Sequence, residues 1–206
     1  MERVLTKEKN EIKLLLPTLS FNKVLVVGVV HGDEPQGEFL INSYLGAVKN
    51  SHLMFVPVLN PDGMARNSRT NSNGVDINRN FPTRNWELSQ RDEYYGGDFS
   101  GSEIETRFIV DVIEKYSPKL ILTLHAPYKI VNYDGSAELF AEEISKIMGY
   151  PVQRDIGYPT PGSFGTYASI EKNIPIITLE LDELCDKNDL IKPVFKVFEY
   201  LETLIL

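Results

Sequence analysis

Four ionisable side chains follow the ends of three apolar segments: His31 and Glu34 after VLVVGVV, His125 after LILTL, and Glu180 after IPIITL. Apolar runs of this length, rich in β-branched residues, predict strands that are buried on both faces. In open α/β sheets the ligand crevice lies outside the carboxyl ends of the strands. We therefore expect the two imidazoles and the two carboxylates to meet at one edge of a sheet.

These residue types indicate metal-dependent hydrolysis. Two histidines and one glutamate form a ligand set of catalytic zinc, which leaves a fourth position to water. The metal acidifies that water toward neutral pH, and a second carboxylate can take its proton and pass it to a leaving amine. His31 and Glu34 alone are a weak signal, because a polar residue that ends a strand is the alternative. Together with His125 and Glu180, they favour a metal site with a general base.

Arginines gather in the segment 60–101, which has little periodicity and is rich in Asn, Arg, Gly and Asp. Long segments of this kind inside a compact domain are usually functional or disordered, and we expect an ordered, site-building loop. Arg66, Arg69 and Arg79 lie in it, the last beside Asn78. A positioned arginine can stabilise an oxyanion, and its fork binds a carboxylate in a bidentate manner. Solvated loop arginines are the alternative.

Strands and helices alternate along the chain. We expect strands at 11–16, 24–30, 53–59, 120–124 and 174–179, and helices at 35–50, 102–116, 138–148, 164–171 and 189–206. Ser102 and Glu105 have the spacing of a capping box, and Pro57 suggests an edge strand or a bulge. The alternation predicts a three-layer α/β/α sandwich with a mostly parallel or mixed central sheet, in one domain over residues 1–206.

Composition excludes several classes of protein. Hydrophobic residues make up 42% and charged residues 24%, which is typical of a globular chain. The net charge of −8 argues against a nucleic-acid partner. Cys185 is the single cysteine, so an intrachain disulfide is excluded. The sequence has neither the apolar core of a signal peptide nor a membrane-spanning segment, and we expect a cytoplasmic protein without a membrane partner. It sets no oligomeric state.

Ordered motifs give the chain a family resemblance. They are HGDE at 31–34, NPDG at 60–63, RNSR at 66–69, GVDINRNFP at 74–82, TLH at 123–125 and TLEL at 178–181. In this order they resemble the zinc metallocarboxypeptidases, over about residues 24–182. Within that family the chain looks most like the bacterial murein peptide amidases, through HGDEPQG, SEIETR, TLHAP and YPTPGSFGTYAS.

The resemblance implies catalytic roles for five residues. His31, Glu34 and His125 would bind one Zn²⁺ ion. Glu180 would act first as the general base and then as the general acid. Arg69 would polarise the scissile carbonyl and hold the oxyanion.

The resemblance also implies a substrate. Asn78 and Arg79 would bind the terminal carboxylate of a small peptide, and a tyrosine would close over it. Tyr158 is the best candidate by position and Tyr167 the second, with a packed loop aromatic as the alternative for Tyr158. The bond cut would join γ-D-glutamate to meso-diaminopimelate in a murein peptide, as in cell-wall peptide recycling.

Three alternatives differ in substrate or in chemistry. Amidohydrolases of the aspartoacylase or succinylglutamate desuccinylase kind are similar at H-G-x-E, N-P and D-x-N-R, but NPDG and RNSR favour a peptidase. A C-terminal carboxypeptidase acting on ordinary peptides is the second alternative. The third is a peptide-binding module that has lost catalysis, against which Glu180 argues, since binding alone needs no base.

Overall fold

The computed structural model describes residues 2–20, 23–155 and 157–204. A hairpin and a six-stranded sheet of order β4-β3-β5-β8-β6-β7 contain all the strands assigned there. The strands are β1 (Glu2–Leu5), β2 (Glu11–Leu14), β3 (Val24–Val27), β4 (Met54–Val56), β5 (Leu120–His125), β6 (Ile130–Asp134), β7 (Val152–Gln153) and β8 (Ile176–Glu180). Neighbouring strands of the large sheet are parallel except β6 and β8, which are antiparallel. The expected mixed sheet is therefore present.

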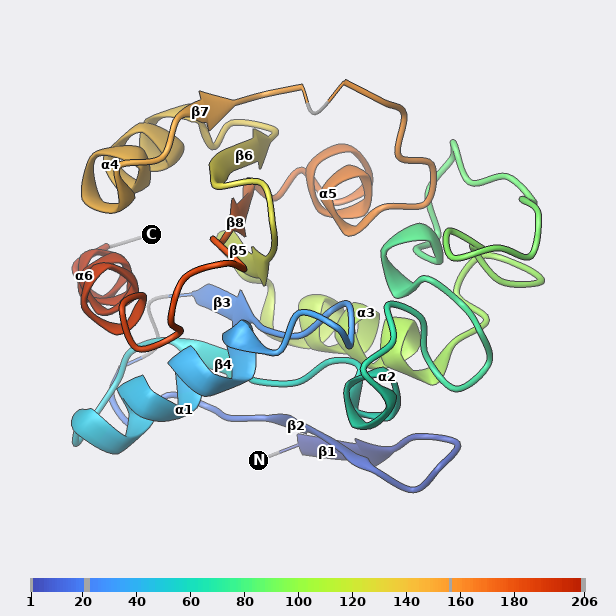
Figure 1. The fold of residues 1–206 in the computed structure, drawn as a ribbon, viewed down its shortest axis with the longest axis horizontal. Helices are drawn as coiled ribbons and strands as arrows, with labels where there is room; N and C mark the ends of the chain where they lie inside the picture. The colour runs from blue at the N-terminus through green and yellow to red at the C-terminus, as the bar shows by residue number, and fades with distance from the viewer. Residues whose placement is uncertain (1, 21–22, 156, 205–206) are drawn as a thin grey trace.

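Helices cover both faces of this sheet, as expected for a three-layer sandwich. Figure 1 places α1, α4 and α6 on one side of the sheet and α3 and α5 on the other. The helices are α1 (Gln36–Ala47), α2 (Pro61–Arg66), α3 (Ile104–Tyr116), α4 (Glu138–Met148), α5 (Phe164–Thr166) and α6 (Ile191–Glu202), with a 3-10 turn η1 (Ile77–Arg79) and a π-helical turn η2 (Tyr167–Glu171). Among the described residues, none of these helices is long and apolar enough to cross a membrane.

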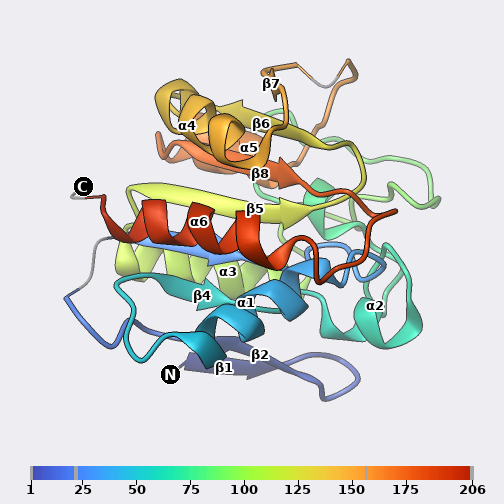
Figure 2. The ribbon, with the colours of Figure 1, turned by 60° about the vertical axis from the view of Figure 1, so that its left-hand side comes forward.

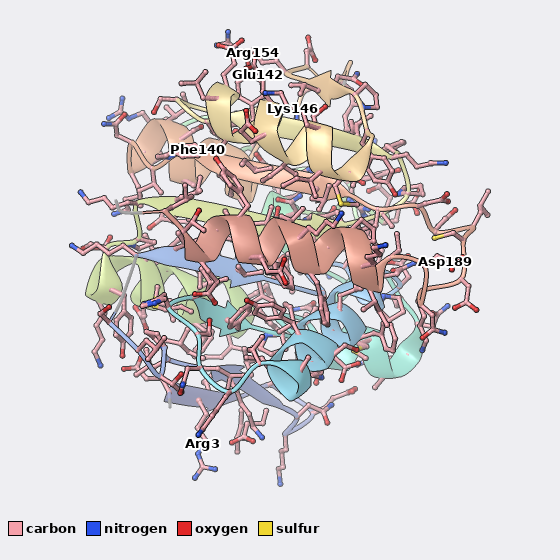
Figure 3. The ribbon with its side chains drawn as sticks, turned by 90° about the vertical axis from the view of Figure 1, so that its left-hand side faces the viewer. Arg3, Phe140, Glu142, Lys146, Arg154 and Asp189 are labelled. Atoms are coloured by element: carbon pink, nitrogen blue, oxygen red, sulfur yellow. The ribbon has the colours of Figure 1, made fainter. Side chains whose placement is uncertain are left out.

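The central strands send alternate side chains into two separate cores. On one face, Leu122, Leu179 and Val131 pack with the buried sides of α1, α4 and α6, the helices nearest the viewer in Figure 3. On the other face, Ile121 and Ile176 pack with α3 and α5. Complete burial on both faces explains why these strands are short continuous apolar runs.

The segment 60–101 is ordered and lies at the carboxyl edge of the sheet. Figure 2 shows the arrowheads of β5 and β8 pointing toward α2 and this segment. Ile77 and Phe81 anchor it, since both are fully buried in the core that also holds α3 and α5. Phe81 stacks on Phe164 of α5, with ring centroids 4.6 Å apart. The loop is therefore fixed against the helix layer rather than free in solvent.

Several expected elements end earlier or are built differently. The strand expected at 24–30 ends at Val27, because Val29 has a left-handed φ of 46° and the chain turns there. Glu103, not Ser102, precedes α3, and no side chain caps that helix, so the predicted capping box is wrong. The short strands β1, β6 and β7 were not predicted. The last helix ends at Glu202, and residues 205–206 of its expected range lie outside the described residues.

Candidate active site

The first two candidate ligands stand on a tight turn after β3. Val29 adopts its left-handed conformation between two backbone bonds, from Leu59 N–H to the Gly28 carbonyl at 3.1 Å and from Asn60 N–H to the Val29 carbonyl at 2.9 Å. A β-branched residue rarely adopts such a φ, so these bonds hold a strained backbone in place. At Gly32 a Cβ atom would lie 2.1 Å from the Gly63 carbonyl carbon, so only glycine fits between the two loops. The turn thus packs its Gly32 backbone against α2 and leaves the side chains of His31 and Glu34 in contact with each other.

Three candidate ligands meet at the carboxyl edge, as the sequence predicted. One donor atom from each of His31, Glu34 and His125 lies within 4.8 Å of the others. Nδ1 of His31 lies 2.8 Å from one Glu34 carboxylate oxygen, and Nδ1 of His125 lies 2.9 Å from the other. Both histidines are almost fully buried, at 3% and 4% exposed. Two imidazole nitrogens and one carboxylate facing a common point form a donor set of the catalytic zinc type.

A buried aspartate orients one of these histidines. Asp76 Oδ1 lies 3.1 Å from His31 Nε2, and its Oδ2 accepts from Nε and Nη2 of Arg69 at 3.0 and 2.8 Å. A carboxylate on the far nitrogen of a histidine fixes the tautomer that leaves Nδ1 free for a metal. The donor set therefore fits a metal ion in chemistry and in orientation. Asp76 was not predicted as a site residue, although it lies in the motif GVDINRNFP.

Buried charges shift the pKa values of this cluster. Burial opposes protonation of His31, yet the carboxylates of Glu34 and Asp76 raise its pKa to about 9. Burial would raise the pKa of Glu34, but the two histidines hold it below its usual range. The pKa of Asp76 is also lowered despite its burial, by His31 first and by Arg69 and Arg79 next. The carboxylates of Glu34 and Asp76 are thus ionised, and a bound metal ion would replace the proton that they favour on His31.

Glu180 lies beside the metal donors. Strand register pairs it with His125 across β5 and β8, and the Leu181 N–H donates to the His125 carbonyl at 2.7 Å. Its Oε2 atom is buried and has no hydrogen-bond partner among the described residues. Burial raises its pKa, although the neighbouring His125 acts in the opposite direction. A carboxylate with a raised pKa next to the donor set has the properties of a general base.

Two residues of η1 line the same pocket from the loop side. Asn78 accepts a hydrogen bond from the Phe164 N–H at 2.9 Å through Oδ1, and this bond ties η1 to α5. The Arg79 side chain is 8% exposed, and its Nη1 donates to the Asn78 carbonyl at 2.8 Å. Arg69 reaches the pocket as well, with Nη1 3.4 Å from His31 Nδ1. The structure thus brings Arg69 and Arg79 to the pocket that the predicted metal donors line.

Of the three remaining candidate residues, one lines the pocket and two lie outside it. Tyr158 lines the pocket, and burial together with a hydrogen bond to Tyr128 raises its pKa. Tyr167 is 2% exposed and packs against Phe81, so it is a core residue and not a substrate contact. Arg66 also lies outside the site, because it pairs with Glu8 of the N-terminal hairpin. The pocket that holds the predicted residues has a volume of about 440 Å³.

Comparison with known proteins identifies the family of this chain. A model of the family described as zinc carboxypeptidase matches residues 21–138. Murein peptide amidase A of Escherichia coli K12 is 32% identical over 178 residues, which cover 80% of this chain and 73% of that protein. The Vibrio campbellii protein of the same name is also 32% identical, over 79% of this chain and 70% of its own length.

Solved structures show the same fold. Murein-tripeptide amidase from Escherichia coli O157 has a TM-score of 0.85 and 26% identity, and the match covers 96% of this chain and 89% of that one. Carboxypeptidase A from Helicoverpa armigera has a TM-score of 0.76 at 19% identity, over 97% and 66% of the two chains. The matching family model and these relatives show that the chain is a hydrolase and belongs to the zinc carboxypeptidase family.

Proposed function

We propose that the chain is a zinc-dependent amidase that cuts the γ-D-glutamyl–meso-diaminopimelate bond of murein peptides. The observation that carries the chemistry is the convergence of His31, Glu34 and His125 beside the unpartnered oxygen of Glu180. The support for the substrate is the similarity to proteins named murein peptide amidase A.

His31, Glu34 and His125 would hold one zinc ion, with Asp76 orienting His31 from behind. When bound, the ion supplies positive charge for the carbonyl oxygen and a water acidified toward neutral pH. Glu180 takes the proton of the attacking water on its free oxygen and then gives it to the leaving amine. The raised pKa of Glu180 suits this second role, because a carboxyl that holds a proton more strongly can deliver it to an amine nitrogen.

Arg69 and the two residues of η1 have separate roles in the proposal. Arg69 has one guanidinium nitrogen near the metal donors, where it would stabilise the developing oxyanion. Arg79, with the Asn78 amide, would bind the carboxylate of the leaving residue, since a guanidinium matches a carboxylate in a bidentate manner. Tyr158 would contact the substrate from the pocket wall. A bound peptide would then place its scissile carbonyl between Glu180 and Arg69.

Product analysis tests the proposal. The zinc-loaded full chain is incubated with L-Ala-γ-D-Glu-meso-diaminopimelate, with N-acetyl-aspartate and N-succinyl-glutamate, and with ordinary peptides. We expect release of diaminopimelate from the first and no release from the N-acyl amino acids. Deacylation of those compounds alone would instead favour an aspartoacylase-like enzyme. Release of ordinary C-terminal residues alone would favour a general carboxypeptidase. The count of one ion is checked by elemental analysis of the purified protein.

A cytoplasmic location and a role in recycling cell-wall peptides stay predictions. They depend on the cellular compartment that contains both substrate and enzyme, and not on the chemistry of the site. Fractionation of cells that produce the tagged full chain checks them, with recovery in the cytoplasmic fraction as the expected result.

A further inference from the structure

The guanidinium of Arg69 is attached to the site through a single oxygen atom. Its Nε and Nη2 atoms both donate to Oδ2 of Asp76, at 3.0 and 2.8 Å. The other oxygen of Asp76 lies 3.1 Å from His31 Nε2 and accepts from the Asn78 N–H at 2.8 Å. A fork that meets two oxygens fixes the plane of a guanidinium, whereas a fork on one oxygen leaves the plane free to tilt. The direction of Nη1, the third nitrogen, therefore depends on a second contact.

Tyr94 supplies a contact of this kind. The Arg69 Cζ atom lies over the Tyr94 ring, 5.0 Å from the ring centroid. The face of an aromatic ring attracts a guanidinium, and a ring placed against it restricts how far its plane can tilt. The Arg69 side chain is 22% exposed, so this attraction is partly shielded from solvent. Tyr94 and Asp76 thus hold the guanidinium from two directions, which leaves Nη1 for the pocket.

The backbone around Tyr94 is fixed on both sides. The Tyr94 N–H donates to the carboxylate of Asp92 at 2.8 Å, which forms a local turn. The next residue, Tyr95, is buried, and its carbonyl accepts from the Asp76 N–H at 2.8 Å. The segment that carries Tyr94 is therefore bonded to the same aspartate that holds Arg69.

Packing accounts for Tyr95 but not for Tyr94. The Tyr94 side chain is 47% exposed and lies outside both apolar cores. Its ring lines the pocket together with Arg69 and Arg79. A tyrosine in this position can act through Arg69 or by contacting the substrate itself. The two roles differ in their kinetics, because the first affects the chemical step and the second affects binding.

We propose that Tyr94 is a positioning residue that fixes the guanidinium plane of Arg69, so that Nη1 points to the place where the oxyanion forms. The inference rests on the proposed function, which gives Arg69 the oxyanion role. Donors that are oriented before the reaction need no reorganisation as the charge develops. Loss of the ring lowers the rate of the chemical step and leaves ground-state binding unchanged, because the oxyanion develops only as the bond is attacked.

A double-mutant cycle between Tyr94 and Arg69 tests the inference. Tyr94→Leu removes the aromatic face but keeps an apolar side chain, and Tyr94→Phe keeps the face. Steady-state rates are measured with the zinc-loaded full chain and L-Ala-γ-D-Glu-meso-diaminopimelate. We expect Tyr94→Leu to lower kcat by about 5- to 30-fold, as for the loss of a cation–π contact, with KM within about twofold of wild type. Tyr94→Phe should keep at least about half of the wild-type kcat.

The Arg69→Ala background separates positioning from direct contact. Without the guanidinium the ring has nothing to position, so Tyr94→Leu should change kcat by less than about twofold there. A loss of the same size in both backgrounds would overturn the inference, and so would an effect of Tyr94→Leu on KM alone. Equal losses in Tyr94→Leu and Tyr94→Phe would also overturn it, since the hydroxyl and not the ring face would then matter.

Phe99→Leu is the matched control for these variants. Its ring is 61% exposed in the same loop, and Phe99 is not among the residues that line the pocket. We expect this variant to keep the wild-type kcat and KM. Thermal midpoints of Phe99→Leu and Tyr94→Leu should both stay near the wild-type value, because each change removes an exposed ring.

A measurement without turnover keeps the inference separate from the proposed function. Solvent exchange of the Arg69 Nε–H, followed by NMR of the zinc-loaded chain labelled with ¹⁵N-arginine, reports how firmly the guanidinium is held. We expect exchange at least about fivefold faster in Tyr94→Leu than in wild type, and wild-type exchange in Tyr94→Phe. Equal exchange in wild type and Tyr94→Leu would contradict the positioning role. A failure of the proposed function alone would leave this difference in place, and the kinetic comparison would move to whichever amide the enzyme cleaves.

Discussion

The two faces of the central strands bury different chemistry. Leu179 points into an apolar core and is fully buried. Glu180, the next residue, points to the other face, where it lies beside the candidate metal donors with one oxygen that has no partner among the described residues. The same alternation separates Leu124 from His125 on the neighbouring strand. At the carboxyl ends of these strands, one residue thus serves packing and the next one serves chemistry.

This difference shows how the apolar face positions the polar one. Strand side chains alternate, so a slip of one residue would move Leu179 and Leu181 to the pocket face and Glu180 to the apolar core. Leu179 and Leu181 on either side of Glu180 are both fully buried, which makes such a slip costly. The register of β8 against β5, and with it the position of Glu180 beside His125, is therefore set largely by residues that never contact substrate.

The strongest test of this comparison is Glu180→Gln. The amide keeps the size of the side chain but cannot accept and return the proton, so we expect kcat to fall by about 10³-fold or more. Zinc content and the thermal midpoint should stay near wild-type values, because the carboxylate is outside the proposed donor set. Steady-state rates, elemental analysis and thermal unfolding measure these quantities. A variant that keeps a tenth of the wild-type kcat would rule out Glu180 as the base.

Leu179→Ala makes the matched change on the opposite face. Removing a fully buried leucine from a packed core costs about 2–5 kcal/mol of unfolding free energy. We expect urea unfolding to shift accordingly, while kcat per folded molecule stays within about tenfold of wild type. A variant with normal stability but no activity would show that the two faces are not separate in function.

The site residues that could be predicted from the sequence are those placed by the end of a strand. His31, Glu34, His125 and Glu180 each follow an apolar run, and the ends of neighbouring parallel strands meet at one edge. Their convergence could therefore be predicted without knowing the loops between them. The three-layer sandwich followed from the same alternation of elements, whereas the single domain over residues 1–206 stays a prediction.

The features that were missed or wrongly predicted depend mainly on contacts between residues far apart in the sequence. Asp76 orients His31 from a loop that has no periodic pattern. Its position depends on how that loop packs against the core, which the sequence pattern does not reveal. Glu105 was expected to cap a helix, yet it is buried beside Asn71. The strand β6 was missed because it is half polar, although the alternation of Asn132, Tyr133 and Asp134 was a usable signal of period two.

Asp76→Asn tests whether this loop residue orients His31, which lies at the carboxyl edge of the sheet. The amide cannot hold the charge that pairs with Arg69 and His31, so we expect zinc affinity to fall by about 10- to 100-fold. Competition with a chelator measures this affinity. Asp33→Asn is the matched control, because Asp33 is exposed between the two ligands and is not expected to bind the ion. Equal zinc affinity in wild type and Asp76→Asn would contradict the assigned orienting role.

Glu105→Gln gives the smallest expected effect. It tests whether a buried carboxyl outside the candidate site also has a raised pKa. Burial raises the pKa of Glu105 to about 7, and its Oε1 atom is buried without a hydrogen-bond partner in the part of the chain that the structure describes. The carboxyl of Glu105 therefore loses its proton at lower pH in the unfolded chain than in the folded protein. Its contribution to the free energy of unfolding falls as the pH rises from about 4.5 to about 7. Unfolding in urea across this range should show Glu105→Gln gaining on the order of 1 kcal/mol relative to wild type at pH 8. Glu142→Gln, on the exposed face of α4, should follow the wild-type curve, and parallel curves for all three proteins would show that Glu105 titrates normally.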